Sequence, residues 1–204
     1  EAGALTEGHA HLDIGLHLEP RLVGVRYQAA RSEALAGNWT DIERLLLAPV
    51  DAVSPFSYWA DRFRLSLWRG NAAWMDDLDL ASLTGLTEDE RLLAVDVATL
   101  LREKKPALEM RARIDAMRTS PATGSRTKTL LSQLQAEGAG YLGDRERCVS
   151  CVLAAVDTGL FDSPWLERCP ALACAVGGPE LEGARATVKA RADAVIAALR
   201  SERS

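Results

Sequence analysis

Four cysteines are the residues in this chain whose type and spacing come nearest to a chemical site. All of them follow position 147, as Cys148, Cys151, Cys169 and Cys174. A C-x-x-C pair can form half of a zinc site or a redox-active pair. A second such pair is absent, because Cys169 and Cys174 are five positions apart. We interpret Cys148 and Cys151 as small hydrophobic residues on the buried face of one helix, with a metal or redox role as the alternative.

A glycine-rich run at 138–143 (GAGYLG) has the spacing G-x-G-x-x-G of dinucleotide-binding loops. Such a loop binds pyrophosphate only where a strand precedes it and a helix begins at it. The preceding residues, 129–137, have helical spacing and helix-forming composition instead. We therefore interpret these glycines as small residues that let neighbouring helices pack closely.

The remaining polar clusters are interpreted as solvated helix surface or helix ends rather than as metal sites. They are His9, His11 and His17 near the start of the chain, and Asp76, Asp77 and Asp79. The motifs of protein kinases, P-loop proteins, serine hydrolases and zinc proteases are all absent from the sequence. The sequence therefore predicts a chain that is not an enzyme, with no catalytic residue, no bound metal and no cofactor.

The composition is typical of a globular protein, with 48% hydrophobic and 26% charged residues. A net charge of −5 argues against a nucleic-acid partner, which requires concentrated Lys and Arg. Charges are mixed, as in 144–147 (DRER), which predicts a solvated face. No apolar run is long enough to insert into a membrane. We expect a cytoplasmic location, or a periplasmic one if the parent protein has a membrane span upstream.

Periodicity predicts helices throughout the chain. Their ranges are about 4–18, 21–36, 39–48, 55–69, 71–79, 87–103, 106–118, 126–142, 145–157, 162–168 and 180–201. At 12–18, alternating leucines and isoleucine favour a strand as the alternative. Two apolar stripes are predicted to face neighbours: Leu92, Val95, Ala98 and Leu101, then Val188, Ala192, Val195, Ile196 and Leu199.

Turns that end successive helices recur at a nearly constant spacing. Gly37, Gly70, Lys104 and Gly143 follow one another at intervals of 33, 34 and 39 residues. The tetratricopeptide repeat, a helix–turn–helix unit, has a period of about 34 residues. The run 15–20 (GLHLEP) also resembles the end of such a repeat, and Pro20 suits the start of the next helix.

Residues 145–181 resemble the closing segment of tetratricopeptide regions in bacterial eukaryotic-like Ser/Thr protein kinases and related multidomain signalling proteins. The matching runs are 154–162 (AAVDTGLFD) and 165–172 (WLERCPAL), with 177–181 (GGPEL) as a departure from the usual Gly-Asp-Pro-x-Phe turn. The resemblance implies an all-α fold, a right-handed superhelix of stacked antiparallel helix pairs. It implies one domain over 1–204, with a partial repeat at 1–19, repeats at about 20–54, 55–86, 87–120 and 121–161, and a C-terminal cap at 162–204.

The function implied by this resemblance is a non-catalytic scaffold of a larger signalling protein that binds a protein or peptide segment. Self-association into a homodimer is a further hypothesis, and a small-ligand sensor that regulates an attached enzyme is the alternative. Carrying over the groove positions of tetratricopeptide proteins places partner-binding residues at Tyr27, Arg31, Arg64 and Trp68. Each repeat thus offers an aromatic residue and an arginine, which interfaces favour. The competing interpretation is that Trp68 packs between repeats and that the arginines are solvated.

Overall fold

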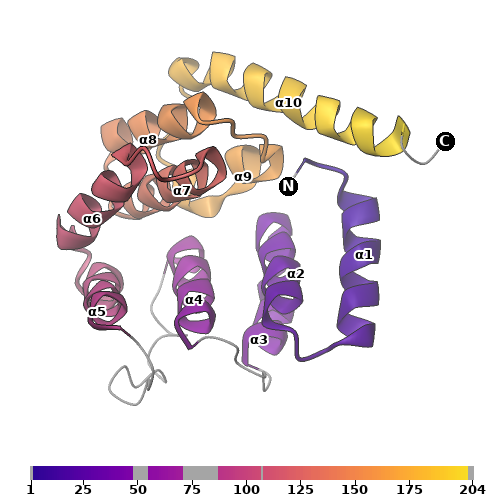
Figure 1. The fold of residues 1–204 in the computed structure, drawn as a ribbon, viewed down its shortest axis with the longest axis horizontal. Coiled ribbons are helices and arrows are strands. Elements are labelled where there is room, and N and C mark those ends of the chain that lie inside the picture. Colours follow the sequence, from indigo (N-terminus) through magenta and orange to yellow (C-terminus); the bar gives the residue numbers. More distant parts are fainter. Residues whose placement is uncertain (1, 48–54, 71–86, 107, 202–204) are drawn as a thin grey trace. The chain divides into compact units, whose positions relative to one another are not determined.

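A computed structural model describes residues 2–47, 55–70, 87–106 and 108–201 (Figure 1). All regular structure in these ranges is helical, which confirms the all-α prediction. The strand alternative at 12–18 is wrong, because these residues belong to the first helix. The predicted helix at 71–79, with Asp76, Asp77 and Asp79, lies outside the described residues.

The chain divides into two compact units, which we call the N-terminal unit and the C-terminal unit. The N-terminal unit comprises residues 5–103, and the C-terminal unit comprises 104–204 together with 1–4. The predicted repeat boundaries within a single domain stay a prediction.

The described helices of the N-terminal unit are α1 (Leu5–Leu18), α2 (Val23–Ala36), α3 (Trp39–Leu47), α4 (Pro55–Arg69) and α5 (Glu88–Glu103). Helix α2 packs against α1, α3 and α4, and α4 packs against α5. Four of these helices supply deeply buried apolar side chains to the core of the N-terminal unit, among them Ala30, Ile42, Leu65, Leu67, Val97 and Leu100. Burying a leucine, isoleucine or valine side chain contributes about 1.5–3 kcal/mol, and this burial holds the helices together.

The C-terminal unit contains α6 (Leu108–Thr119), α7 (Ser125–Tyr141), α8 (Arg145–Asp157), α9 (Ser163–Arg168) and α10 (Glu182–Ser201). Two short 3-10 helices, η2 (Pro170–Leu172) and η3 (Pro179–Leu181), lie between α9 and α10. Helix α7 packs against α6, α8 and η2, while α10 packs against α8, α9 and η3. In α9, Trp165 is fully buried, and its indole Nε1 donates to Glu137 Oε1 at 2.6 Å.

The four predicted turns all adopt the left-handed backbone conformation. The φ angles are 84° at Gly37, 78° at Gly70, 51° at Lys104 and 75° at Gly143. Gly37 and Gly143 also share one hydrogen-bond pattern, in which the N–H of the glycine and that of the next residue return to the helix. This pattern satisfies the last helical carbonyls and is the Schellman motif. At Lys104 the conformation is unusual for a residue with a side chain.

The predicted stripe on α5 is only half correct. Ala98 and Leu101 are buried, but Leu92 and Val95 are 38% and 50% exposed. A spacing of three residues falls about 60° short of a full helical turn at each step, so Leu92 and Leu101 lie on opposite sides. The buried face instead follows alternating steps of three and four, through Ala94, Val97 and Leu101.

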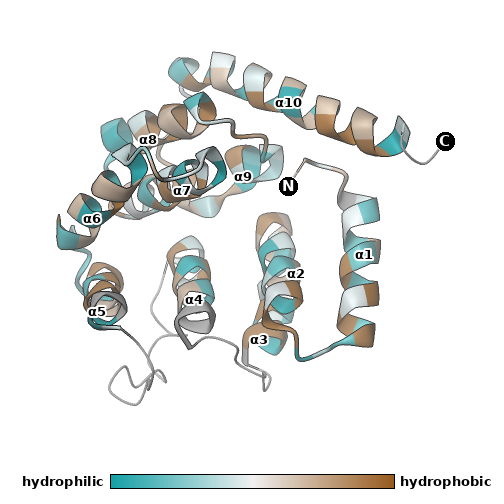
Figure 2. Cartoon of the chain, viewed as in Figure 1, coloured by the Kyte–Doolittle hydropathy of each residue, from teal (hydrophilic) through white to brown (hydrophobic). Residues whose placement is uncertain are grey.

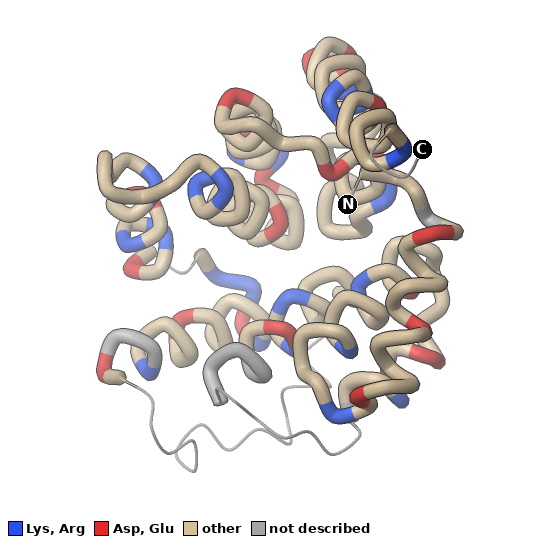
Figure 3. Tube along the Cα trace, turned by 45° about the vertical axis from the view of Figure 1, so that its right-hand side comes forward, with Lys and Arg blue, Asp and Glu red and all other residues tan. Residues whose placement is uncertain are grey.

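The apolar stripe predicted for the last helix is correct in its first half only. Figure 2 shows hydrophilic and hydrophobic residues alternating along α10. Val188 and Ala192 are buried, Val195 and Ile196 are half-buried, and Leu199 is exposed. Acidic and basic residues are interspersed along the helices of both units (Figure 3). Within the described ranges, no helix combines the length and apolar character needed to cross a membrane.

Candidate partner-binding site

The four residues predicted to bind a partner come together in the N-terminal unit. Tyr27 and Arg31 lie four apart on α2, and Arg64 and Trp68 lie four apart on α4, so each pair shares a helix face. Because α2 packs against α4, the two faces meet. We call these four residues the Trp68 cluster.

The Trp68 ring is the centre of the cluster. The guanidinium carbons of Arg31 and Arg64 lie 5.7 Å and 5.4 Å from the ring centroid. Arg64 also donates from Nη1 to the Tyr27 hydroxyl oxygen at 3.2 Å. A desolvated cation–π contact contributes up to about 2 kcal/mol, so these contacts stabilise the pairing of α2 with α4.

Most of the Trp68 cluster is buried. Trp68, Arg31 and Arg64 are 3%, 6% and 7% exposed, and Tyr27 is half-buried. The interpretation of Arg31 and Arg64 as solvated residues is therefore wrong. Trp68 Nε1 is buried and makes no hydrogen bond within the part of the chain that the structure describes. The accessible part of the cluster is the tyrosine.

A carboxyl group with an unusual pKa lies beside the cluster on α4. Burial raises the pKa of Asp61 from its ordinary value of 3.8 to about 7, and the Arg64 guanidinium opposes part of the rise. Near neutral pH this carboxyl group is therefore divided between its neutral and charged forms. Its ionisation changes the charge next to Arg64.

Sequence reasoning missed two further buried arginines, Arg26 and Arg62, which flank α3. Arg26 Nη2 donates to the carbonyl of Arg44 and Arg62 Nη2 to that of Leu46, each at 3.4 Å. Both carbonyls belong to the last turn of α3, which has no intrahelical donors for them. The only sign of these contacts in the sequence was the spacing of the arginines along α2 and α4. That spacing does not reveal that the side chains reach the C-terminal end of α3.

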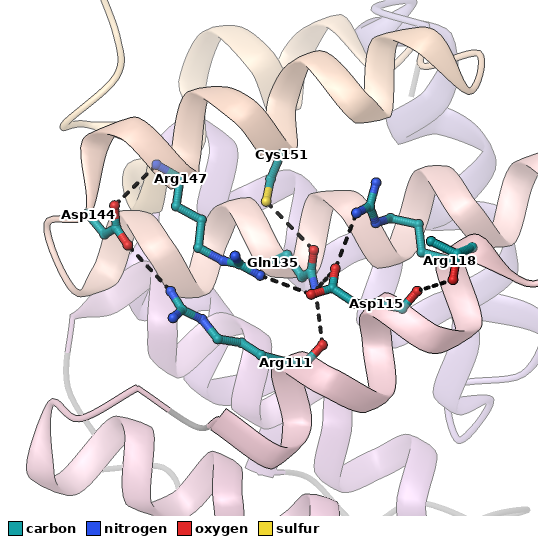
Figure 4. A network of polar contacts seen from close by, with 8 residues as sticks. Arg111, Asp115, Arg118, Gln135, Asp144, Arg147 and Cys151 are labelled. Atoms are coloured by element: carbon teal, nitrogen blue, oxygen red, sulfur yellow. Dashed lines mark hydrogen bonds and ion pairs between the residues drawn. The ribbon is translucent and has the colours of Figure 1, made fainter.

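A second polar network lies in the C-terminal unit, between α6, α7 and α8 (Figure 4). Arg111 and Asp115 of α6 pair with Asp144 and Arg147 respectively, at 3.4 Å in both cases. Gln135 of α7 donates from Nε2 to Asp115 Oδ1 at 3.0 Å. We call this arrangement the Asp115 network.

The Asp115 network corrects the solvated-face interpretation of 144–147. Asp144 and Arg147 are half-buried in ion pairs, and Asp144 also caps α8 by accepting from the Arg147 backbone N–H at 3.1 Å. Arg145 and Glu146 are exposed, and Arg145 forms an ion pair with Glu180. One charged run thus contains both exposed residues and half-buried residues that contact α6, because successive helical positions face different ways.

The other candidates from the sequence have the following positions. His11 and His17 are exposed, but His9 is half-buried, and its Nε2 lies 2.6 Å from Ser32 Oγ. The predicted exposure of His9 is therefore wrong, since packing against α2 covers it. No group of three potential His, Cys, Asp or Glu metal ligands occurs among the described residues.

The glycine-rich run lies in α7 and the turn that follows it, as the helical interpretation predicted. A Cβ atom added at Gly140 would lie 1.8 Å from the carbonyl oxygen of Ala171. The glycine therefore allows η2 to approach α7 closely, which is the packing role expected of it. Cys148 and Cys151 are buried on α8, also as expected.

Comparison of the chain with models of known protein families, with curated proteins and with solved structures found no match. The tetratricopeptide resemblance and the association with a kinase thus stay predictions.

Proposed function

We propose that the chain is a non-catalytic module that binds a protein or peptide segment through the surface at the Trp68 cluster, as part of a larger signalling protein. The observation that carries this proposal is the convergence of Tyr27, Arg31, Arg64 and Trp68. Two of these residues belong to each of two expected repeats, and their side chains contact one another. Tyr, Trp and Arg are also the residue types most enriched in binding hot spots.

The four left-handed turns support the repeat interpretation from which the positions of the site residues follow. Gly37, Gly70, Lys104 and Gly143 each end a helix with a positive φ angle. A tetratricopeptide-like superhelix would stack the resulting hairpins and leave a curved face for a partner. That arrangement is part of the proposal.

The role of each residue follows from its burial. The Trp68 ring is buried together with Arg31 and Arg64, which contact it. These three side chains therefore form a rigid base that loses little conformational entropy on binding. Tyr27 is half-buried and presents its ring to a partner. Arg64 donates to the Tyr27 hydroxyl, and the positive charge next to the tyrosine favours an acidic side chain on the partner.

The proposal is tested by selecting binding peptides from a random display library against the whole chain. Their affinities are then measured by titration calorimetry for wild type and for Tyr27→Ala. Loss of a hot-spot aromatic residue costs at least about 2 kcal/mol, so affinity should fall roughly thirtyfold or more.

Tyr141→Ala is the matched control. Tyr141 lies in α7 of the C-terminal unit, and its ring also has a cationic neighbour, with Lys104 Nζ 5.7 Å from its centroid. We expect the selected peptides to bind this variant as they bind the wild type. Equal affinity for Tyr27→Ala and wild type would refute the assignment of the site.

A further inference from the structure

Helix α6 is held in the C-terminal unit by polar contacts more than by apolar burial. Of its twelve residues, only Ile114 is buried. Leu108 and Met117 are 69% and 50% exposed. Its neighbours α7 and α8, in contrast, each bury several apolar side chains. Because apolar burial is the main contribution that holds a helix in place, α6 is the least firmly held of the three.

The contacts that hold α6 to its neighbours belong to the Asp115 network (Figure 4). Its two ion pairs, from Arg111 to Asp144 and from Asp115 to Arg147, join side chains that are 25% to 42% exposed. Gln135 of α7 donates from Nε2 to Asp115 Oδ1 at 3.0 Å and to the Arg111 carbonyl at 3.4 Å. Water and salt compete with ion pairs of this exposure, so the network is a weak and salt-sensitive attachment.

The docked position of α6 also leaves one polar group unsatisfied. Arg118 pairs with Asp115 within α6 at 3.2 Å, but its Nε is buried and has no acceptor within the described ranges. A buried donor without an acceptor destabilises the state in which it is buried. Hydration of this group therefore favours departure of α6.

A thiol on α8 is joined to α6 through Gln135. Cys151 is 7% exposed, and its Sγ donates to Gln135 Oε1 at 3.7 Å, while the nitrogen of the same amide donates to α6. Figure 4 shows Cys151 directed from α8 toward Gln135. Burial raises the pKa of the Cys151 thiol, so it is a poor nucleophile while it is covered. Departure of α6 would break the far end of this chain of hydrogen bonds and admit water to the thiol.

The connections on both sides of α6 lack helical structure. Residues 104–106, which precede it, are exposed, and so are most of residues 120–124, which follow it. Exposed connections make few contacts that oppose a local opening. Helix α6 can therefore leave its neighbours as one element without unwinding α7.

We propose that α6 is a releasable strap, which leaves α7 and α8 when the Asp115 network breaks, while α7 and α8 stay packed on each other. The closed form covers Gln135 and Cys151, and the open form presents them to solvent. An opening confined to one weakly held element requires less free energy than unfolding of the whole unit. Ionic strength sets the open fraction, because screening weakens the ion pairs that close the strap.

Alkylation of the whole chain with iodoacetamide, mapped by mass spectrometry, measures the opening. Cys148 is the internal reference, because it lies on the same helix, is fully buried and is next to Gly140. We expect Cys151 to react roughly tenfold faster than Cys148 or more, since it needs only the local opening. Its rate should rise between about 0.1 M and about 1 M salt. Amides of α6 should exchange with solvent ahead of those of α7 and α8.

Asp115→Asn and Glu180→Gln separate strap opening from unfolding of the whole unit. Each change replaces a carboxylate with an amide and removes an ion pair with an arginine on α8. Asp115→Asn should speed alkylation of Cys151 roughly fivefold. Glu180→Gln should leave that rate unchanged, because the pair between Glu180 and Arg145 does not break when α6 leaves.

Several outcomes would overturn the strap. They are equal rates at Cys151 and Cys148, a Cys151 rate that does not rise with salt, and one that Asp115→Asn leaves unchanged. An equal response of Cys151 to Asp115→Asn and Glu180→Gln would show that the thiol reacts only when the whole unit unfolds. Amides of α6 that are as well protected as those of α7 and α8 would contradict the proposal independently of the thiols.

Discussion

The Trp68 cluster and the Asp115 network use arginine in two different ways. In the first, Arg31 and Arg64 are buried against an aromatic ring and a phenol. In the second, Arg111 and Arg147 pair with carboxylates, and their side chains are 25% and 31% exposed. Partly exposed ion pairs typically contribute about 0–1 kcal/mol, while buried aromatic and arginine residues dominate binding hot spots. This difference is the reason for proposing the partner site at the Trp68 cluster and only a structural role for the Asp115 network, which links α6, α7 and α8.

In both units, an arginine side chain donates to carbonyl groups in the last turn of a helix. Arg191 Nη1 of α10 donates to the carbonyl of Val156 in the last turn of α8, at 2.6 Å. Arg26 and Arg62 make the corresponding contacts to the last turn of α3. Cations near a helix C-terminus satisfy carbonyls and the helix dipole together. Arginine burial alone is therefore not a sign of a binding site, and the aromatic partners make the distinction.

Among the changes that we consider, removal of the Trp68 ring should lower the free energy of unfolding the most. Trp68→Ala is expected to lower the free energy of unfolding by about 3–5 kcal/mol, because a large buried side chain and two cation contacts are lost. Trp68→Phe, which keeps a ring, should lose less. Urea denaturation measures both variants. A loss below about 1 kcal/mol for Trp68→Ala would mean that the ring does not hold α2 to α4.

The next largest effect is expected in the C-terminal unit, at Gly140. Gly140→Ala places a methyl group against the Ala171 backbone and should cost about 3 kcal/mol, since backbone must move. Gly183→Ala is the control, because nothing lies within 4 Å of its added Cβ and it is in α10. That change should be neutral or stabilise by up to about 1 kcal/mol. Equal effects of the two changes, measured by thermal unfolding, would contradict the packing described for α7 and η2.

Folding stability should depend on pH in opposite directions at Asp61 in the N-terminal unit and at Asp115 in the C-terminal unit. A folded-state pKa of about 7 at Asp61, above the usual 3.8, means that folding retains a proton that the unfolded chain releases. Stability should fall as pH rises from about 4 to about 7, by at most about 1.4 kcal/mol per pH unit. Asp61→Asn should flatten this dependence in the N-terminal unit. Hydrogen exchange of α4 amides across this range measures it, and an unchanged slope in Asp61→Asn would exclude Asp61 as the cause.

Replacement of Asp115 should have the smallest effect on folding stability. Burial alone would raise the pKa of its carboxyl group, but hydrogen bonds from Gln135 and Arg118 and the charge of Arg147 outweigh it and lower the pKa. The carboxylate therefore stabilises the fold above about pH 4, and this contribution is lost as pH falls below that value. Asp115→Asn should cost about 1 kcal/mol at neutral pH and little in acid. A cost that does not change between these conditions, in denaturant titrations, would argue against the ion pairs.

Helix positions and turns were predictable from the sequence, because each rests on local chemistry. Glycines at 37, 70 and 143 take a backbone conformation that few other residues accept, and apolar periodicity marked the helices between them. The contacts of Tyr27, Arg31, Arg64 and Trp68 followed from helical spacing once α2 and α4 were neighbours.

What escaped prediction depends on contacts between distant parts of the chain. The approach of η2 to α7 at Gly140 requires the chain after α9 to return, and no spacing rule encodes that return. The pairing of Asp144 and Arg147 with α6 likewise depends on how three helices pack. On α5, Leu92 is exposed although it was predicted to face a neighbouring helix. The prediction used a period of three residues, which drifts around a helix of 3.6 residues per turn.

Hydrogen exchange with and without a selected peptide tests the central claim most directly. We predict that the bound peptide slows exchange of amides in α2 and α4, the helices that carry the Trp68 cluster, and leaves α6 and α7 unchanged. Protection confined to the C-terminal unit, or none in α2 and α4 at saturating peptide, would contradict it.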